Sequence, residues 1–200
     1  VTVVELLAYT GVTLTAAQAS IATTSTGGTY NISDTGIAIA ALSSSVLNAA
    51  VNIVASGVVD VADAAIIENA TNTGTTAYAI SDTVTALLDS AAGTFTNATA
   101  VTATVESNDH DISALTLDTE VTVIDLAGYT GVVLTLAQGL LATDSVGGGT
   151  SVVTDTVSNL TGEIGDLSGV ATVTATVEAN DSDLSVLTLD NDVTAIDLGV

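Results

Sequence analysis

The sequence repeats itself with a period of 24, and this period constrains the fold more than any other feature. Positions 101–126 return at 173–198, where 19 of the 26 are identical, an offset of 72. The segment that starts at Val1 returns from Val121, an offset of 120, and the segment from Tyr30 returns from Tyr78, an offset of 48. These offsets are 3, 5 and 2 times 24. Such a repeat is typical of solenoids, in which each repeat packs only on its neighbours.

We therefore interpret residues 1–200 as one solenoid of eight full repeats and a remainder. Three repeat types follow one another: one opens with a Val-Thr-Val or similar run, one carries a Ser/Thr-Asp-Thr motif, and one alternates Val or Ala with Thr. The chain begins and ends in the same type, so we expect neither end to be a polar cap and expect stacking or further repeats. The predicted repeats are 1–24, 25–48, 49–72, 73–96, 97–120, 121–144, 145–168 and 169–192, with a partial repeat at 193–200.

Each repeat is expected to open with a short strand of a parallel β-sheet, because β-branched residues favour strands. After Asp82, the apolar residues Val84, Leu87 and Leu88 have the i, i+3, i+4 spacing of an amphipathic helix. The predicted fold is a repeat solenoid of strand-plus-short-helix coils, similar in size to leucine-rich repeats. An all-β solenoid is the alternative, since Thr-rich strands without helices would also fit. The predicted strands are 29–32, 51–54, 77–80, 101–105, 121–124 and 173–177.

The composition excludes several classes of function. The chain has no Lys or Arg and 23 Asp plus Glu, so it offers no basic patch for nucleic acid. It has no Cys and only His110 as histidine, so a zinc site or catalytic triad lacks its parts, and we expect no enzyme. No stretch of about 18 uninterrupted apolar residues predicts a membrane span. A mean hydropathy of +0.63 provides enough apolar material for a core despite the charge.

Two acidic clusters, one the repeat of the other, carry the clearest pattern of metal ligands. Each places three carboxylates and one Asn amide within a single short segment. Oxygen ligands of this kind suit a hard cation, and calcium is the cofactor that we expect if a metal binds. A solvated acidic turn is the more conservative interpretation, since the glycine and the distant Glu of an EF-hand loop are missing. The candidate ligands are Glu106, Asn108, Asp109, Asp111, Glu178, Asn180, Asp181 and Asp183.

Asp34, Asp82 and Asp155 each stand between a predicted strand and the segment that follows it. A carboxylate in this position accepts hydrogen bonds from the exposed N–H groups of a helix start and meets its positive end. We therefore predict that these residues are helix N-caps, with a row of metal ligands as the alternative.

The motif Tyr-x-Ile-Ser-Asp-Thr, the run Val-Thr-Ala-Thr and the segment from Val12 to Gln18 resemble repeats of very large secreted bacterial proteins. These proteins are rich in Ala, Thr and Val and are described as adhesin-like, RTX-associated or surface-layer-like. The resemblance covers nearly the whole chain. It implies export, a location at the cell surface or in a matrix, and often calcium, although the glycine-rich RTX nonapeptides are absent here.

We expect an extracellular structural repeat protein that forms or belongs to a filament, sheath, surface layer or adhesin stalk. Its main partner would be itself, through end-to-end or lateral assembly. The alternative is an adhesin module that binds calcium or cell-surface glycans. The regular repeat and the missing Lys and Arg, which remove every trypsin site, favour a durable exterior protein.

The melting temperature should rise from low to high salt, because no Lys or Arg offsets the repulsion between carboxylates. Calorimetry between about 0.01 M and about 1 M NaCl measures this, since the Debye length falls there from about 30 Å to about 3 Å. A flat or falling response would contradict the clustering of carboxylates on an ordered fold.

Overall fold

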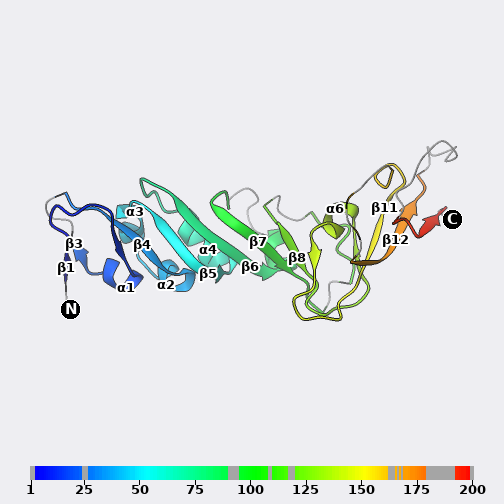
Figure 1. Cartoon of the computed structure of the whole chain (residues 1–200), viewed down its shortest axis with the longest axis horizontal. Coiled ribbons are helices and arrows are strands. Elements are labelled where there is room, and N and C mark those ends of the chain that lie inside the picture. Colours follow the sequence, from blue (N-terminus) through cyan, green and yellow to red (C-terminus); the bar gives the residue numbers. More distant parts are fainter. Residues whose placement is uncertain are drawn as a thin grey trace. The chain divides into compact units, whose positions relative to one another are not determined.

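The structure is a computed structural model that describes residues 3–23, 27–89, 95–107, 110–116, 120–161, 165, 167, 169–178 and 192–198 (Figure 1). The chain forms two compact units. The N-terminal unit comprises residues 1–102 and 118–121, and the C-terminal unit comprises 103–117 and 122–200. Both units combine helices with strands, and every strand pair whose register is described is parallel. The predicted parallel sheet is thus confirmed, in a mixed α/β chain rather than an all-β one.

Strands that follow one another along the chain lie side by side in the main sheet of the N-terminal unit. Their order is β2, β4, β5, β6 and β7. A separate pair, β1 with β3, lies outside this sheet. The strand bounds are Val4–Glu5 for β1, Val12–Leu14 for β2, Ala22–Thr23 for β3, Tyr30–Thr35 for β4, Ile53–Val59 for β5, Thr76–Thr83 for β6 and Ala98–Thr104 for β7.

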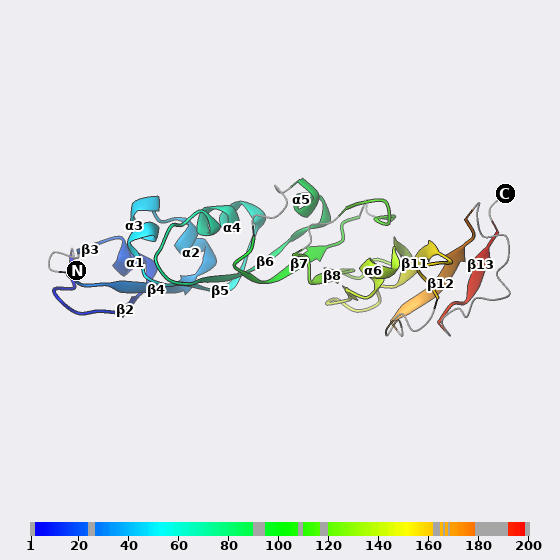
Figure 2. The same ribbon diagram turned by 90° about the horizontal axis from the view of Figure 1, so that it is seen from above.

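Short helices connect these strands and pack against one face of the sheet. The helix α1 contacts β4, α2 contacts β4 and β5, and α4 contacts β5 and β6, while α2 also contacts α1 and α4. Figure 2 shows these helices on the same side of the strands. No helix among the described residues has the length and apolar character needed to cross a membrane. The helix bounds are Ala16–Ala19 for α1, Gly36–Ala40 for α2, Ser44–Ala49 for α3, Val61–Glu68 for α4 and Val84–Asp89 for α5.

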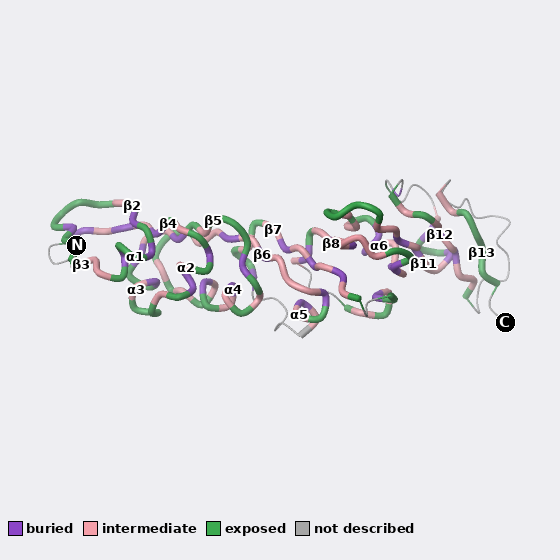
Figure 3. The backbone as a smooth tube through the Cα atoms, turned by 90° about the horizontal axis from the view of Figure 1, so that it is seen from below, coloured by how far each residue is buried: buried purple, intermediate pink, exposed green. Residues whose placement is uncertain are grey.

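The core of this unit lies between the sheet and the helices (Figure 3). Alternate strand residues point inward, as the period of two along a strand requires, so that Tyr30 and Ile32 are buried on β4. On α4, Ala64 and Ile67 are fully buried whereas Ile66 is 45% exposed. Burial three residues apart shows that the helix presents a single narrow apolar stripe to the sheet.

The C-terminal unit contains a second run of parallel strands. In this unit β8 is the sheet neighbour of the end of β7 and pairs on its other side with β10. A separate sheet has the order β9, β11, β12, β13. The short helix α6 contacts β9 and β11. The bounds are Val123–Asp125 for β8, Val132–Leu134 for β9, Leu136–Gly139 for α6, Ala142–Thr143 for β10, Ser151–Thr156 for β11, Val170–Thr176 for β12 and Ala195–Asp197 for β13.

Both full copies of the first repeat type contain three strands, two more than the single strand that the sequence predicts for each repeat. In each copy a turn follows the first strand, and the second strand belongs to another sheet. This turn holds Leu7 at φ 49° and Gly11 at φ 69°, and its counterpart holds Ala127 at φ 50° and Gly131 at φ 71°. Leu and Ala seldom adopt positive φ, so contacts beyond the local sequence impose this turn.

The strand register does not advance by the full sequence period at each step. Tyr30 lies opposite Val12, a step of 30 − 12 = 18, and Thr76 lies opposite Ile53, a step of 76 − 53 = 23. An irregularity in β5 between Val54 and Val58 shifts the register further. The repeat bounds therefore stay a prediction from the sequence, which the strand pairing does not test.

Candidate functional site

Asp34 joins two consecutive strand-helix segments through its two carboxylate oxygens. Its Oδ1 accepts a hydrogen bond from the N–H of Thr35, at 2.8 Å, within its own segment. Its Oδ2 accepts from the N–H of Ala16, at 3.0 Å, and Ala16 is the first residue of α1, which precedes β4 in the chain. The helix that follows β4 is capped instead by Thr35, whose hydroxyl accepts from the N–H of Ala38.

The same arrangement occurs twice more. The Oδ2 atoms of Asp82 and Asp155 each accept a hydrogen bond, at 2.9 Å, from the first residue of a preceding helix, Val61 of α4 and Leu136 of α6. Their Oδ1 atoms accept from the next backbone N–H, at 2.7 and 2.8 Å. We call Asp34, Asp82 and Asp155 the bridging aspartates. The prediction that these residues are helix N-caps was wrong, because the N-caps of α1, α4 and α6 are Thr15, Asp60 and Thr135. The bridging aspartates instead accept from the first N–H of each of these helices.

This chemistry explains how the fold holds carboxylates in a chain without cationic side chains. The first N–H groups of a helix lack an intrahelical partner and lie at its positive end. A carboxylate that accepts from them forms a charge-assisted hydrogen bond, which is shorter and stronger than a neutral one. Each bridging aspartate therefore satisfies a helix start and ties neighbouring segments together at once.

Amide side chains provide a second set of links on the sheet of the N-terminal unit. Asn31 accepts hydrogen bonds at its Oδ1 from the N–H and the side-chain amide of Asn52, at 3.2 and 2.9 Å, and donates to the carbonyl of Gly11 at 3.2 Å. Asn52 accepts in turn from the N–H and hydroxyl of Thr75, at 2.9 and 3.0 Å. These residues line an open groove, and their hydrogen bonds run between segments. We interpret this ladder as structural.

Two further carboxylates hold the turn of the C-terminal unit. Burial raises the pKa of Asp125, but hydrogen bonds from Ser145 and Ala127 outweigh this effect and leave the pKa below its ordinary value. Backbone hydrogen bonds, first from Gly149 and then from Gly128, lower the pKa of Asp144. Both side chains therefore stay ionised and hold the backbone next to Ala127, whose φ is 50°.

The structure describes three of the eight predicted calcium ligands. Glu106 follows β7 and is half-buried, whereas Asp111 and Glu178 are exposed. The Oδ1 of Asp111 accepts hydrogen bonds from the N–H and the hydroxyl of Ser113, at 3.0 and 2.6 Å, as expected of a polar turn. The other five ligands lie outside the described residues: Asn108, Asp109, Asn180, Asp181 and Asp183.

In the described part of the chain, no group of three or more His, Cys, Asp or Glu side chains could hold a metal ion. Because half of the first cluster and three of the four ligands of the second lie outside that part, calcium binding stays a prediction. His110 is exposed, as expected for a surface residue, and its carbonyl accepts a hydrogen bond from the N–H of Val133.

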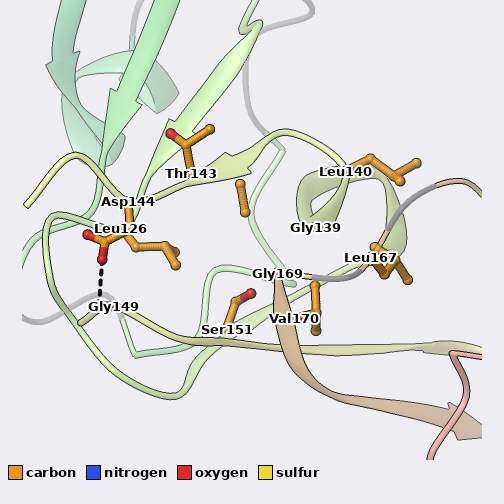
Figure 4. A pocket seen from close by; sticks show the side chains of 11 residues that line it. Leu126, Gly139, Leu140, Thr143, Asp144, Gly149, Ser151, Leu167, Gly169 and Val170 are labelled. Atoms are coloured by element: carbon orange, nitrogen blue, oxygen red, sulfur yellow. Dashed lines mark hydrogen bonds between the residues drawn. The ribbon is translucent and has the colours of Figure 1, made fainter. Parts of the chain in front are cut away.

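A pocket in the C-terminal unit was not predicted from the sequence. It has a volume of about 200 Å³, and Ser151 on β11 lies at its wall (Figure 4). Ser151 is 1% exposed, and its hydroxyl has no hydrogen-bond partner among the described residues. A buried hydroxyl without a partner is costly, which makes this pocket the least satisfied part of the described core. Its lining residues are Leu126, Gly139, Leu140, Ala142, Thr143, Asp144, Gly149, Ser151, Leu167, Gly169 and Val170.

No family model, curated protein or solved structure matches this chain. The resemblance to secreted repeat proteins therefore stays a prediction, and the functional argument depends on the geometry alone.

Replacing Asp82 with Ala should lower the free energy of unfolding by about 1 kcal/mol, the usual effect of losing a helix cap. Chemical denaturation measures the change. Asp63→Ala is the matched control, because it removes the same charge from the first turn of α4, where Asp82 accepts from the N–H of Val61. Equal stability of the two variants would show that the bridging bond contributes nothing beyond its charge.

Asp125→Asn tests the pH dependence that follows from the lowered pKa. The carboxylate stabilises the fold fully above its unfolded-state pKa of about 3.8, and this contribution is lost as the pH falls through the lower folded-state value. The difference in melting temperature between wild type and variant should therefore be largest above pH 5 and shrink as the pH falls below about 3.8. A difference that stays constant with pH would contradict this assignment.

Proposed function

We propose that the chain is part of an extracellular structural repeat protein, wound as a solenoid of strand-plus-helix coils. It would form or belong to a filament, sheath, surface layer or adhesin stalk. The observation that carries the proposal is the recurrence of the bridging aspartates Asp34, Asp82 and Asp155. Each binds the start of a preceding helix, so the same link joins successive segments at three places.

Equivalent residues of the two full copies of the first repeat type support this proposal, because they make the same bonds. Thr15 and Gln18 form a capping box at α1, and the residues 120 positions later do so at α6. The N–H of Gly11 donates to the hydroxyl of Thr29 at 2.9 Å, and the N–H of Gly131 donates to that of Thr150 at 3.0 Å. Equivalent residues of the two copies thus make the same hydrogen bonds, as expected of repeats in a solenoid.

The bonding pattern also favours a self-assembling role over a binding one. Strand pairing, bridging aspartates and the amide ladder all act between segments that are neighbours along the chain. In such a one-dimensional architecture, a terminal coil presents unpaired strand edges that another copy of the chain can extend. The partner that fits is therefore the protein itself.

The charge supports a location outside the cell. With 23 acidic residues and no Lys or Arg, the surface offers trypsin-like proteases no cleavage site and carries a strong negative field. Such a field keeps assemblies soluble at low salt and lets cations promote their association. Lateral or end-to-end contacts would thus respond to the ionic composition of the medium.

Assembly should increase as salt screens the carboxylates. We expect sedimentation velocity to show larger species at about 1 M than at about 0.01 M NaCl, because the Debye length falls about tenfold. Negative-stain micrographs of the same samples should show rods or fibres. A single species of compact particles at every salt and protein concentration would refute the structural role.

A calcium series at constant ionic strength, with and without a chelator, separates the two versions of this role. Assembly that follows ionic strength alone supports the structural protein. Assembly or melting temperature that responds to calcium alone favours the calcium-binding adhesin module instead.

A further inference from the structure

The pocket at Ser151 occupies a place that an aromatic ring fills in the N-terminal unit. Ser151 lies opposite Val132 in the sheet, as Tyr30 lies opposite Val12. Four residues further on, Asp155 and Asp34 make the same bridging bonds. Register and hydrogen bonding therefore both identify Ser151 as the structural equivalent of Tyr30.

Tyrosine at this position is a core residue. Tyr30 is 3% exposed, and its hydroxyl donates to the carbonyl of Val46 at 2.8 Å. The third copy of the motif has Tyr78 here, which is 1% exposed and donates its hydroxyl to Glu68. Burial raises the pKa of both phenols, as expected of rings enclosed in the core. Ser151 alone leaves the position without a ring.

The residues around Ser151 do not fill the space that the tyrosine ring would occupy. Counted back from the next strand, where Val173 lies opposite Val153 as Ile53 lies opposite Ile32, an offset of 173 − 53 = 120, Leu167 is the equivalent of Leu47 and Gly169 is that of Ala49. Both line the pocket. Leu140 replaces a smaller residue, but it is 44% exposed, so much of its side chain remains in solvent. The missing ring is therefore not replaced from within the described part of the chain.

The pocket has the volume for a small aromatic molecule, and its walls are partly apolar and partly polar. Leu126, Leu167 and Val170 provide apolar surface, and Figure 4 shows the Ser151 side chain directed into the space between Leu126 and Leu167. A cavity of about 150 Å³ lined by apolar residues can bind benzene, so about 200 Å³ accommodates one substituted ring. The carboxylate of Asp144 at the wall disfavours anionic ligands.

We propose that the Ser151 pocket is a binding site for a neutral one-ring phenol. The ring would occupy the place that the Tyr30 ring has in its own unit, and the hydroxyl of Ser151 would gain the hydrogen-bond partner that it lacks in the described part of the chain. The site requires only the C-terminal unit, so the inference does not depend on the proposed structural role.

The test uses p-cresol, which is the tyrosine side chain as a free molecule. Saturating p-cresol should raise the melting temperature of the wild-type protein, because a ligand that binds only the folded state stabilises it. Calorimetry should give one site, and NMR should show contacts from the ring to methyl groups of Leu126, Leu167 and Val170. No binding, or contacts elsewhere on the protein, would overturn the proposal.

Two variants separate ring binding in the pocket from binding elsewhere on the protein. Ser151→Tyr supplies the ring covalently and should abolish p-cresol binding while raising the melting temperature without ligand. Ser151→Ala keeps the space but removes the hydroxyl, so it should bind toluene like the wild type and p-cresol several-fold more weakly. If Ser151→Tyr does not fold, Ser151→Ala and the NMR contacts still decide. Undiminished p-cresol binding to folded Ser151→Tyr would show that the pocket is not the site and holds only water.

Discussion

The absence of Lys and Arg is the constraint on which the structure depends. A folded chain with 23 carboxylates has no cationic side chain to pair with them, so the backbone must supply the donors. Asp34, Asp82 and Asp155 each accept from two backbone N–H groups, one of them at a helix start. The short helices therefore provide partial positive charge where the composition provides none, in addition to their apolar stripes.

The sequence predicted the main strands well because their signal is local. The β-branched run at 77–80 lies within β6, the run at 101–105 overlaps the second half of β7, and the apolar spacing after Asp82 marks α5. The short strands β3 and β10 were missed. The extra strands β2 and β9 were also missed, because the turn before them needs Leu7 and Ala127 at positive φ, which neither residue favours on its own. The capping boxes at Thr15 and Thr135 were a readable signal for the helices that follow these strands.

The candidate sites show the same division between local and tertiary information. A bond from Asp82 to a helix start could be predicted from its place after a strand, but the helix whose first N–H it binds lies one segment earlier, and only the folded chain brings them together. The Ser151 pocket is visible in the sequence once the motif is aligned on its aspartate, since Tyr30 and Tyr78 then stand against Ser151. If the copies are aligned by the 24-residue period instead, Thr150 stands opposite Tyr30, and the replacement of tyrosine by Ser151 is not visible.

Backbone capping also explains how the negative charge can grow with the number of segments. Each segment that adds a bridging aspartate joins it to a helix start, so the donor and the charge increase together. Asp125 and Asp144 follow the same logic, with turn N–H groups in place of a helix. Carboxylates in the predicted calcium clusters are crowded close together in the sequence, where like charges repel most. A bound cation would therefore act there first, and the capped segments would not need it.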